Sequence, residues 1–261
     1  MKKQIWLLPS FAGFMIFYII PFFASFYYAF VDSAFSKRFV GFSNIFALFE
    51  NPYFCRAMKN TFLFTVISVP AVMILSVTAA ILLLRFTYRF SFVRNAFFLP
   101  VLLPSAAIAA VWNTYLPQIS QEQPFWSLLV IFLWKYSGLN MMLIFTALTG
   151  VDGDMLDASR IDGAGAWRQL IFITLPNIMP TLFFVLILSF VNSLKIFRES
   201  YLLYGNHPDE RVYMLQNYLG NQFDKLNYQN IASAAIFFAL LVYAVVAVLY
   251  SCERRWSASV W

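Results

Sequence analysis

Long apolar stretches separated by short polar segments dominate this chain. A helix needs about 20 apolar residues to cross a hydrocarbon layer about 30 Å thick. Windows close to that length run over Ile5–Phe30, Thr61–Leu84, Ala96–Leu116, Phe125–Leu148, Ile178–Leu194 and Ile231–Ser251. Only helices and closed barrels satisfy their backbone inside lipid. The pattern therefore predicts an all-α, polytopic membrane helix bundle with six transmembrane helices.

The first window resembles a secretory signal in position but not in form. It is longer than the usual apolar core of a signal peptide, and no small-x-small cleavage site follows it. We therefore expect an uncleaved first span. The gaps between windows are too short for a further folded unit, so residues 1–261 are expected to form a single domain.

Basic residues near the span ends predict the orientation. An even number of spans places both termini on one side, and the positive-inside rule makes that side cytoplasmic. The residues concerned are Lys2, Lys3, Arg254 and Arg255 at the termini, and Arg85, Arg89, Arg94, Arg160 and Arg168 in the gaps. The segments that carry these arginines are then expected to face the cytoplasm too.

Composition narrows the possible functions. Hydrophobic residues make up 61% of the chain and charged residues 11%, whereas a soluble domain carries about a quarter charged residues. The net charge of +6 comes from basic residues scattered at span ends, which fits contact with membrane lipid and gives no nucleic-acid patch. Under this topology Cys55 and Cys252 are expected on opposite sides of the membrane, too far apart to pair. The single histidine, His207, lies in a polar turn and is not expected to bind a metal.

Sequence motifs for hydrolysis are missing. The chain has no GxxxxGK[ST] phosphate loop, no HExxH helix and no GxSxG elbow. We therefore expect no catalytic residue, no metal and no cofactor in this chain. Any energy for transport has to come from another subunit.

The polar stretch DASRIDGAGAWRQLIFITLP, residues 157–176, separates two of the apolar windows. Met155, Ala158 and Ile161 recur at a spacing that predicts a brief helix with one apolar stripe, and Gly163 is expected to end it. Small residues then make a tight corner, after which helical spacing resumes. Pro176 suits a first helical turn and is expected to begin the fifth span. Physics alone leaves two interpretations open: a solvated connection, or an element that docks on a partner.

The residues of this stretch resemble the EAA loop of ABC importer permeases. The family pattern is EAA, three residues, Gly, nine residues, then I-x-L-P. Here Asp157-Ala158-Ser159, Gly163 and Ile173-Thr174-Leu175-Pro176 keep that spacing. Asp157 replaces Glu and Ser159 replaces the second Ala. The fuller form DGA-x-x-W, Asp162 to Ala164 with Trp167, is similar to the carbohydrate branch of the family.

Other parts of the chain resemble the same family. The segment GFSNIFALFENPYFCRAMKNTFLF, residues 41–64, is similar to the passage from the first outer loop into the next span. Residues 193–219 resemble the maltose-type first permease subunit, with Gly205-Asn206-His207-Pro208 in place of a Gly-Gly-Pro turn.

The resemblance implies a permease domain over 1–261 with a coupling loop at about 150–176 that lodges in a cleft of a separate cytoplasmic ATPase dimer. It implies a sugar importer of the bacterial or archaeal cell membrane, in which the partner ATPase binds ATP and Mg. It also implies a second permease subunit, forming a heterodimer, and an extracytoplasmic solute-binding protein. The loop residues to which the resemblance assigns the coupling are Asp157, Ala158, Ser159, Arg160, Asp162, Gly163, Ala164, Trp167 and Pro176.

Polar and aromatic side chains inside the spans are the candidates for a sugar pathway. The set is Trp112, Trp134, Lys135, Tyr136, Asn140, Ser189, Asn192 and Ser193. The last three share one helix face, which either binds sugar hydroxyls or forms interhelical hydrogen bonds. Lys135 pairs with an acidic sugar or with a carboxylate of a second subunit, or it snorkels along a cavity wall. Trp112 either stacks on a sugar ring or belongs to an interfacial belt.

Other functions remain as alternatives. The EAA pattern occurs in importers of non-carbohydrate solutes as well. An ion-coupled secondary carrier should have acidic residues inside its spans, and an intramembrane enzyme should have a nucleophile paired with a base. The six windows contain neither feature.

Overall fold

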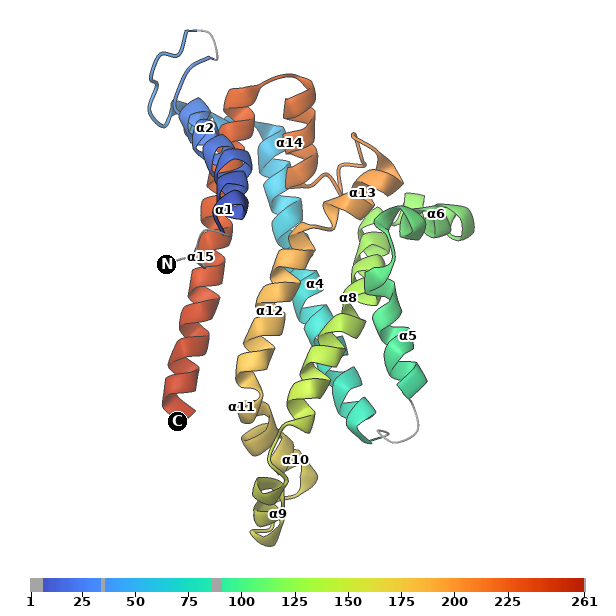
Figure 1. Cartoon of the computed structure of the whole chain (residues 1–261). Helices are drawn as coiled ribbons and strands as arrows, with labels where there is room; N and C mark the ends of the chain where they lie inside the picture. Colours follow the sequence, from blue (N-terminus) through green and yellow to red (C-terminus); the bar gives the residue numbers. More distant parts are fainter. Residues whose placement is uncertain (1–6, 34–35, 86–90, 261) are drawn as a thin grey trace. The chain divides into compact units, whose positions relative to one another are not determined.

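The computed structural model describes residues 7–33, 36–85 and 91–260, and it is built from helices (Figure 1). In these ranges the extended backbone pairs only at an isolated antiparallel bridge between Val31 and Phe39. The all-α prediction is therefore confirmed. Lys2, Lys3 and Arg89 lie outside the described residues. The assignment of the cytoplasmic side stays a prediction.

The helices follow the chain in this order: α1 Leu8–Phe14, a π-helical turn Met15–Ile19, α2 Ile20–Ala29, α3 Ser43–Glu50, α4 Pro52–Arg85, α5 Ser91–Leu102, α6 Ser105–Tyr115, α7 Pro117–Glu122, α8 Pro124–Thr149, α9 Gly153–Ile161, α10 Ala166–Gln169, a second π-helical turn Leu170–Thr174, α11 Leu175–Asn177, α12 Met179–Leu194, α13 Phe197–Tyr204, α14 Leu215–Asp224 and α15 Tyr228–Val260.

The membrane spans agree with the apolar windows, with one exception. Within the described residues, five helical stretches are long and apolar enough to cross a membrane, and six if a bent pair counts as one. The five are Leu8–Ala29, Pro52–Leu84, Pro124–Thr149, Met179–Tyr204 and Tyr228–Trp256. The stretch Met179–Tyr204 corresponds to the predicted fifth span. It continues ten residues beyond the predicted end at Leu194 and therefore includes α13.

The third predicted span, Ala96–Leu116, is not one continuous helix. Its two parts, Ala96–Leu102 and Ser105–Tyr115, are bent by 105° relative to each other. Proline lacks the N–H that would continue the helix, and it disfavours the helical conformation of the residue before it. The helix therefore ends at Leu102, and Pro104 stands at the N-cap of α6 with an extended ψ of 138°.

The chain divides into two compact units, one made of Met1–Met58 with Met214–Ala244, and the other of Lys59–Tyr213 with Val245–Trp261. In the first unit, Ala29 packs with Ala232 and Ile236 of α15. The ring of Phe54 lies 5.4 Å from that of Tyr218, centroid to centroid. The loop before α3 is fixed by Asn44, whose side-chain amide donates to the carbonyls of Ala29 and Val31.

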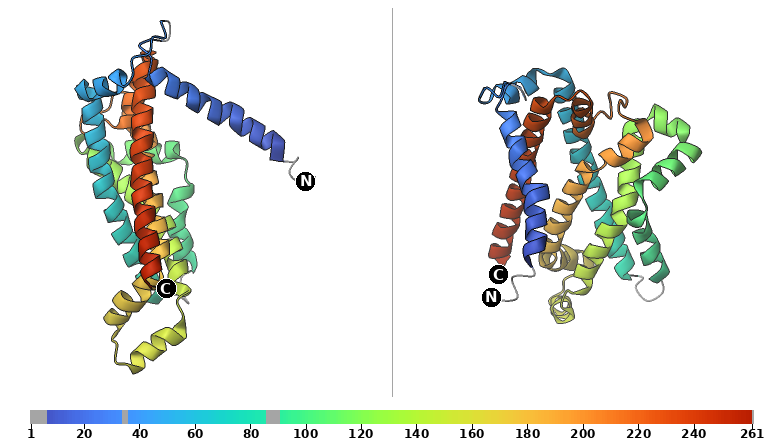
Figure 2. Two further views of the ribbon diagram at one scale, coloured as in Figure 1. Left: turned by 90° about the vertical axis from the view of Figure 1, so that its left-hand side faces the viewer. Right: turned by 45° about the horizontal axis from the view of Figure 1, so that its top comes forward.

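The second unit holds the candidate functional residues. Its core joins α4, α8 and α12 through buried apolar side chains, listed as Ala80, Met141, Ile144, Phe145, Leu148, Ile178 and Val185. Helices α5 and α8 touch at Gly138, where an added Cβ would lie 1.6 Å from the carbonyl oxygen of Phe97. Glycine is needed there because the backbones are too close for a side chain. The segment from α9 to α10 projects beyond the ends of α8 and α12 (Figures 1 and 2).

Candidate functional site

The projecting loop contains the predicted brief helix, α9. Asp152 caps its start by accepting a hydrogen bond from the backbone N–H of Asp154 at 2.9 Å. At the other end the N–H of Gly163 donates to the carbonyl of Arg160 at 3.0 Å, and the N–H of Ala164 to that of Ser159 at 2.9 Å. These bonds form a Schellman motif. Gly163 has the positive φ, 81°, that the motif requires, so the prediction that it ends the helix is confirmed.

A buried side-chain amide joins the two arms of this corner. Gln169 Nε2 donates to Ser159 Oγ at 2.7 Å and to the carbonyl of Leu156 at 2.9 Å. Ser159 Oγ itself donates to the Leu156 carbonyl at 2.7 Å. Both polar side chains are buried. We call this group the Gln169 brace; it fixes α9 against α10. Gln169 was not among the residues predicted from the sequence. A single glutamine directly before the apolar run LIFI could have indicated a buried side-chain amide.

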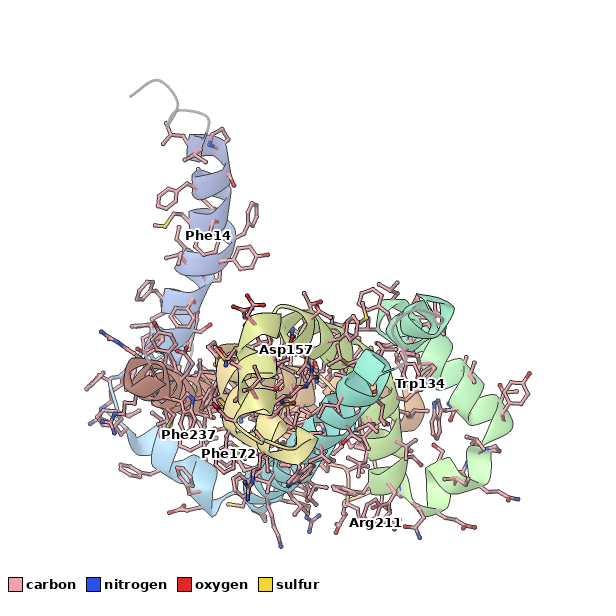
Figure 3. The ribbon with its side chains drawn as sticks, turned by 90° about the horizontal axis from the view of Figure 1, so that it is seen from below. Phe14, Trp134, Asp157, Phe172, Arg211 and Phe237 are labelled. Atoms are coloured by element: carbon pink, nitrogen blue, oxygen red, sulfur yellow. The ribbon has the colours of Figure 1, made fainter. Side chains whose placement is uncertain are left out.

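The same loop exposes large apolar side chains. Ile161 is 88% exposed and Trp167 72% exposed, and Met155 and Phe172 are also exposed. Figure 3 shows this end of the molecule, with Asp157 and Phe172 labelled. Asp157 pairs with Arg160 at 2.6 Å on the surface. Apolar groups of this size on a projecting loop indicate an interaction surface, which favours docking over a solvated connection.

Pro176 does not begin the fifth span, contrary to prediction. It lies in the short α11, and α12 starts at Met179 with Pro180 in its own first turn. Pro176 cannot donate to the carbonyl four residues earlier. The preceding turn, Leu170–Thr174, has widened to a π-helix in which the N–H of Leu175 bonds to the carbonyl of Leu170. The local inference about proline was sound, but a second proline takes the position.

Lys135 lies in a buried ion pair within the chain. Its Nζ is 2.5 Å from Glu199 Oε1, and the two side chains are 8% and 1% exposed. Ser105 completes the group: its Oγ donates to Glu199 Oε1 at 2.7 Å and accepts from Lys135 at 3.2 Å. We call these three residues the ion-pair cluster. The structure thus pairs Lys135 with a carboxylate of its own chain, which none of the three alternatives left open by the sequence included.

The expectation that no acidic residue lies within a span is wrong. Glu199 belongs to α13, which continues the fifth span to Tyr204. The apolar window ended at Leu194 because Lys195, Arg198 and Glu199 lower the local hydropathy. A lysine at mid-depth needs a partner. The sequence thus indicated that Lys135 has a partner, but it did not indicate that this partner is Glu199.

The predicted polar face of α12 is confirmed as a shared, buried face. Ser189, Asn192 and Ser193 are all buried. Asn140 of α8 donates its amide to Ser189 Oγ at 2.8 Å, and Ser193 Oγ lies 3.1 Å from the hydroxyl of Thr65 in α4. These are interhelical contacts. The carbonyl oxygen of the Asn140 side chain is buried without a partner. A role for this face in a sugar pathway stays a prediction.

The aromatic candidates do not join that face as a group. Trp134 is exposed on α8 (Figure 3), whereas Tyr136 is buried and packs on Phe132 with ring centroids 5.0 Å apart. Trp112 is half-buried in α6, beyond the break in the third span. Trp134, Lys135 and Tyr136 therefore point in different directions, as three consecutive residues of a helix must.

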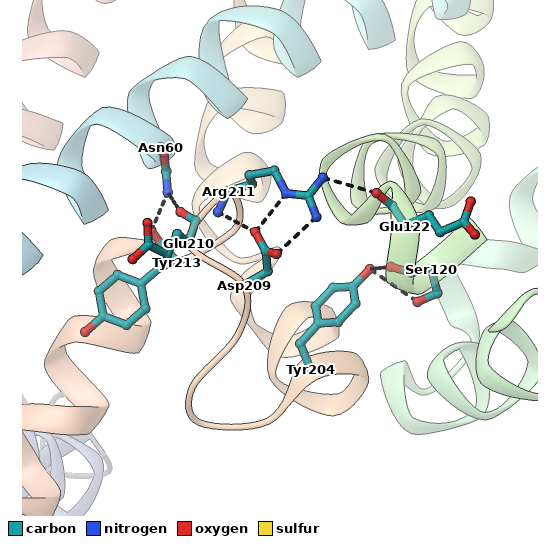
Figure 4. A network of polar contacts seen from close by, with 8 residues as sticks. All are labelled: Asn60, Ser120, Glu122, Tyr204, Asp209, Glu210, Arg211 and Tyr213. Carbon is teal, nitrogen blue, oxygen red and sulfur yellow. Dashed lines mark hydrogen bonds and ion pairs between the residues drawn. The ribbon is translucent and has the colours of Figure 1, made fainter. Parts of the chain in front are cut away.

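A polar network that the sequence did not reveal lies around the loop 205–213 (Figure 4). Arg211 holds Asp209 through two of its nitrogens, at 2.8 and 3.0 Å, and donates to the carbonyl of Glu122 at 3.1 Å. Hydrogen bonds from Arg211 lower the pKa of Asp209 to about 2. Asn60 of α4 donates its amide to the carbonyls of Glu210 and Tyr213.

A second contact links the same region to α7. The Tyr204 hydroxyl donates to the carbonyl of Ser120 at 3.1 Å and lies 3.3 Å from its hydroxyl (Figure 4). Gly205 ends α13 with a positive φ of 74°. The loop is thus fixed to α4 and α7 by polar contacts at both of its ends.

Long apolar helices, a broken span and a projecting loop with exposed apolar side chains are the features of a multi-pass membrane protein. Residues 60–257 match the family described as binding-protein-dependent transport system inner membrane component, and the chain belongs to this family. It is accordingly a multi-pass cell-membrane protein that works with a solute-binding protein.

Relatives cover nearly the whole chain. It is 24% identical to the probable starch degradation products transport system permease protein AmyD of Thermoanaerobacterium thermosulfurigenes, with 97% of this chain and 96% of that protein aligned. It is 25% identical to the arabinooligosaccharides transport system permease protein AraP of Bacillus subtilis, over 94% and 85% of the two chains. The fold is similar to a chain of a bacterial alginate ABC transporter, crystallised in complex with an alginate pentasaccharide-bound periplasmic protein. The TM-score is 0.75 at 21% identity, over 97% of this chain and 96% of that one.

Proposed function

We propose that this chain is the membrane permease subunit of an ATP-driven importer that carries a sugar or oligosaccharide into the cell. The observation that carries the proposal is the loop Gly153–Gln169, where the EAA-type pattern forms a corner that exposes Ile161 and Trp167. The names of the starch-product and arabinooligosaccharide relatives support a carbohydrate as the solute.

The chain itself performs no bond chemistry in this proposal. ATP and Mg²⁺ are bound by a cytoplasmic ATPase dimer, and the loop docks on it from the membrane side. Both termini and the loop then face the cytoplasm. A second permease subunit completes the pathway, and the solute-binding protein delivers the sugar from outside. A sequence without a phosphate loop is expected for such a subunit.

The geometry provides a route for mechanical coupling. The Gln169 brace fixes α9 to α10, and helical backbone continues from α10 through α11 almost to the start of α12. A displacement of α9 by the ATPase therefore reaches the helix that carries Ser189 and Ser193. Rigid elements transmit such a displacement because packed helices do not deform continuously.

The test is co-purification from cells that express the chain with its candidate partners. The tagged chain is isolated, and mass spectrometry identifies the bound proteins for wild type and for Gly163→Asp. The matched control is Gly41→Asp, because Gly41 also has a positive φ, 58°, and an added Cβ there also meets nothing within 4 Å. Both variants place an aspartate at a glycine with a positive φ.

We expect the wild type and the Gly41 variant to bring down an ATPase and a second permease, and the Gly163 variant to lose the ATPase alone. Retention of the ATPase by the Gly163 variant would remove the coupling assignment. The solute is then identified by uptake into proteoliposomes that contain the whole complex. Uptake of a polyamine or another non-carbohydrate in preference to oligosaccharides would contradict the sugar proposal.

A further inference from the structure

The ion-pair cluster is a buried group of charges that the coupling loop does not use. Glu199 Oε1 accepts hydrogen bonds from Lys135 and from Ser105 at the same time. Both charged side chains are more than nine-tenths buried. Charged residues at such depth in a membrane protein are costly and usually have a function.

The cluster joins two helices that each follow a break to one helix that is continuous. Ser105 begins α6 after the 105° bend, and Glu199 lies in α13 after the turn at Lys195. Lys135 is in the unbroken α8. Helices α6 and α13 pack against each other at the end of this unit opposite α9 (Figure 1). Across such an interruption the backbone hydrogen bonds do not by themselves hold one helix segment to the next, so side-chain contacts help to set its position.

Stability alone does not account for charges at this place. Replacing a buried ion pair by apolar residues of similar volume is often neutral or stabilising, whereas removing one partner is strongly destabilising. Two polar atoms at the cluster have no hydrogen-bond partner. Glu199 Oε2 and the hydroxyl of the adjacent Ser200 are buried without a partner, and each such atom carries a desolvation penalty. In some proteins buried charges of this kind are retained because a directional contact specifies one geometry.

We propose that Lys135 and Glu199 are positioning residues for transport. Their ion pair, completed by Ser105, sets α6 and α13 in one arrangement on α8. Because only Lys195 and Ile196 separate α13 from α12, this arrangement also restricts where the end of α12 that carries Ser189 and Ser193 can lie. Neither charged residue contacts the solute. The inference rests on the proposed function, since it assigns these residues a part in solute movement.

The experiment uses the complete complex in proteoliposomes, with the solute-binding protein and a maltooligosaccharide or arabinooligosaccharide as the probe. Wild-type uptake that depends on ATP is established first; its absence for every solute tested would count against the proposed function and not against the cluster. Three forms are then compared with wild type: Glu199→Gln, the apolar pair Lys135→Met with Glu199→Leu, and the exchanged pair Lys135→Glu with Glu199→Lys. Assembly, thermal stability, and the KM and maximal rate of uptake are measured.

We expect Glu199→Gln to reduce assembly, because it leaves Lys135 buried without a counter-charge. The apolar pair should assemble and resist heat as well as wild type, yet its maximal rate of uptake should fall at least about tenfold with little change in KM, as for a loss of positioning. The exchanged pair keeps the directional contact and should transport faster than the apolar pair.

Several results would overturn the proposal. Wild-type uptake by the apolar pair would show that the cluster only fills space. A change confined to KM would make the cluster a solute contact. If the apolar pair does not assemble, the exchanged pair decides: its uptake supports the positioning role, and its assembly without uptake refutes it. Failure of both pairs to assemble would show a purely structural role.

Discussion

Replacing Gly163 by alanine isolates the cost of the left-handed corner in the coupling loop. An added Cβ meets nothing within 4 Å, so the substitution causes no clash. Its only effect is on the backbone, because φ at this residue is 81°. An L residue in the left-handed region costs about 1–2 kcal/mol. Each of the two hydrogen bonds that close the corner is worth about 0.5–1.5 kcal/mol net. The penalty is therefore comparable to the energy that keeps the corner closed.

The expected result is a five- to thirtyfold larger open population of the corner, which corresponds to about 1–2 kcal/mol. Hydrogen exchange of the Ala164 amide reports it directly, because this N–H is bonded to the carbonyl of Ser159 at 2.9 Å. The matched control is Gly165→Ala. Gly165 has a φ of −68°, which any L residue adopts, and an added Cβ there also meets nothing within 4 Å.

We expect faster exchange in the Gly163 variant only. Affinity for the ATPase should fall only as far as the closed population falls, because docking requires the closed corner and the apparent affinity scales with the closed fraction. Equal exchange at Ala164 in the two variants would refute the argument. It would show that the corner is held by contacts other than the Schellman bonds.

Three further predictions concern other contacts. Gly138→Ala should force α5 and α8 apart at the Phe97 carbonyl, at a cost of about 1–3 kcal/mol or more. The thermal unfolding temperature of the purified chain should therefore fall. An unchanged unfolding temperature would mean that the two helices are not in backbone contact. Gln169→Glu keeps the shape of the side chain but removes both donated hydrogen bonds, so sugar uptake per ATP hydrolysed should fall in an assembled complex, and an unchanged ratio would contradict the brace. Asp209 has a pKa of about 2, below its ordinary 3.8. The stabilisation from its contact with Arg211 is therefore fully present above pH 3.8 and is lost as the pH falls through about 2. Carbon NMR should show the pKa of Asp209 returning toward its ordinary value in Arg211→Gln.

The coupling corner shows how far local sequence rules reach. The spacing of Met155, Ala158 and Ile161 predicted α9, and Gly163 ends it as expected. Proline rules were right about the kind of effect but not about its place. Pro104 breaks the third span where a continuous helix was expected, and Pro180 takes the first turn that was assigned to Pro176. A hydropathy window averages the side chains of about 20 residues, so it does not detect the single backbone N–H that a proline lacks.

The class of fold follows from the pattern of apolar residues. The spans are readable because lipid offers the backbone no hydrogen bonds, so each crossing needs a contiguous apolar helix. The polar face of Ser189, Asn192 and Ser193 also follows from helical periodicity alone.

The pairing of the polar groups, in contrast, depends on how distant helices pack. Glu199 lies 64 residues from Lys135 along the chain, and Ser105 reaches the pair only because the third span bends. Gln169 likewise joins Ser159 only after the corner folds back. The hydrophobic pattern and the helix propensity of a segment depend only on residues that are close in sequence. The partner of a buried charge depends on where distant helices cross, and no local rule contains that information.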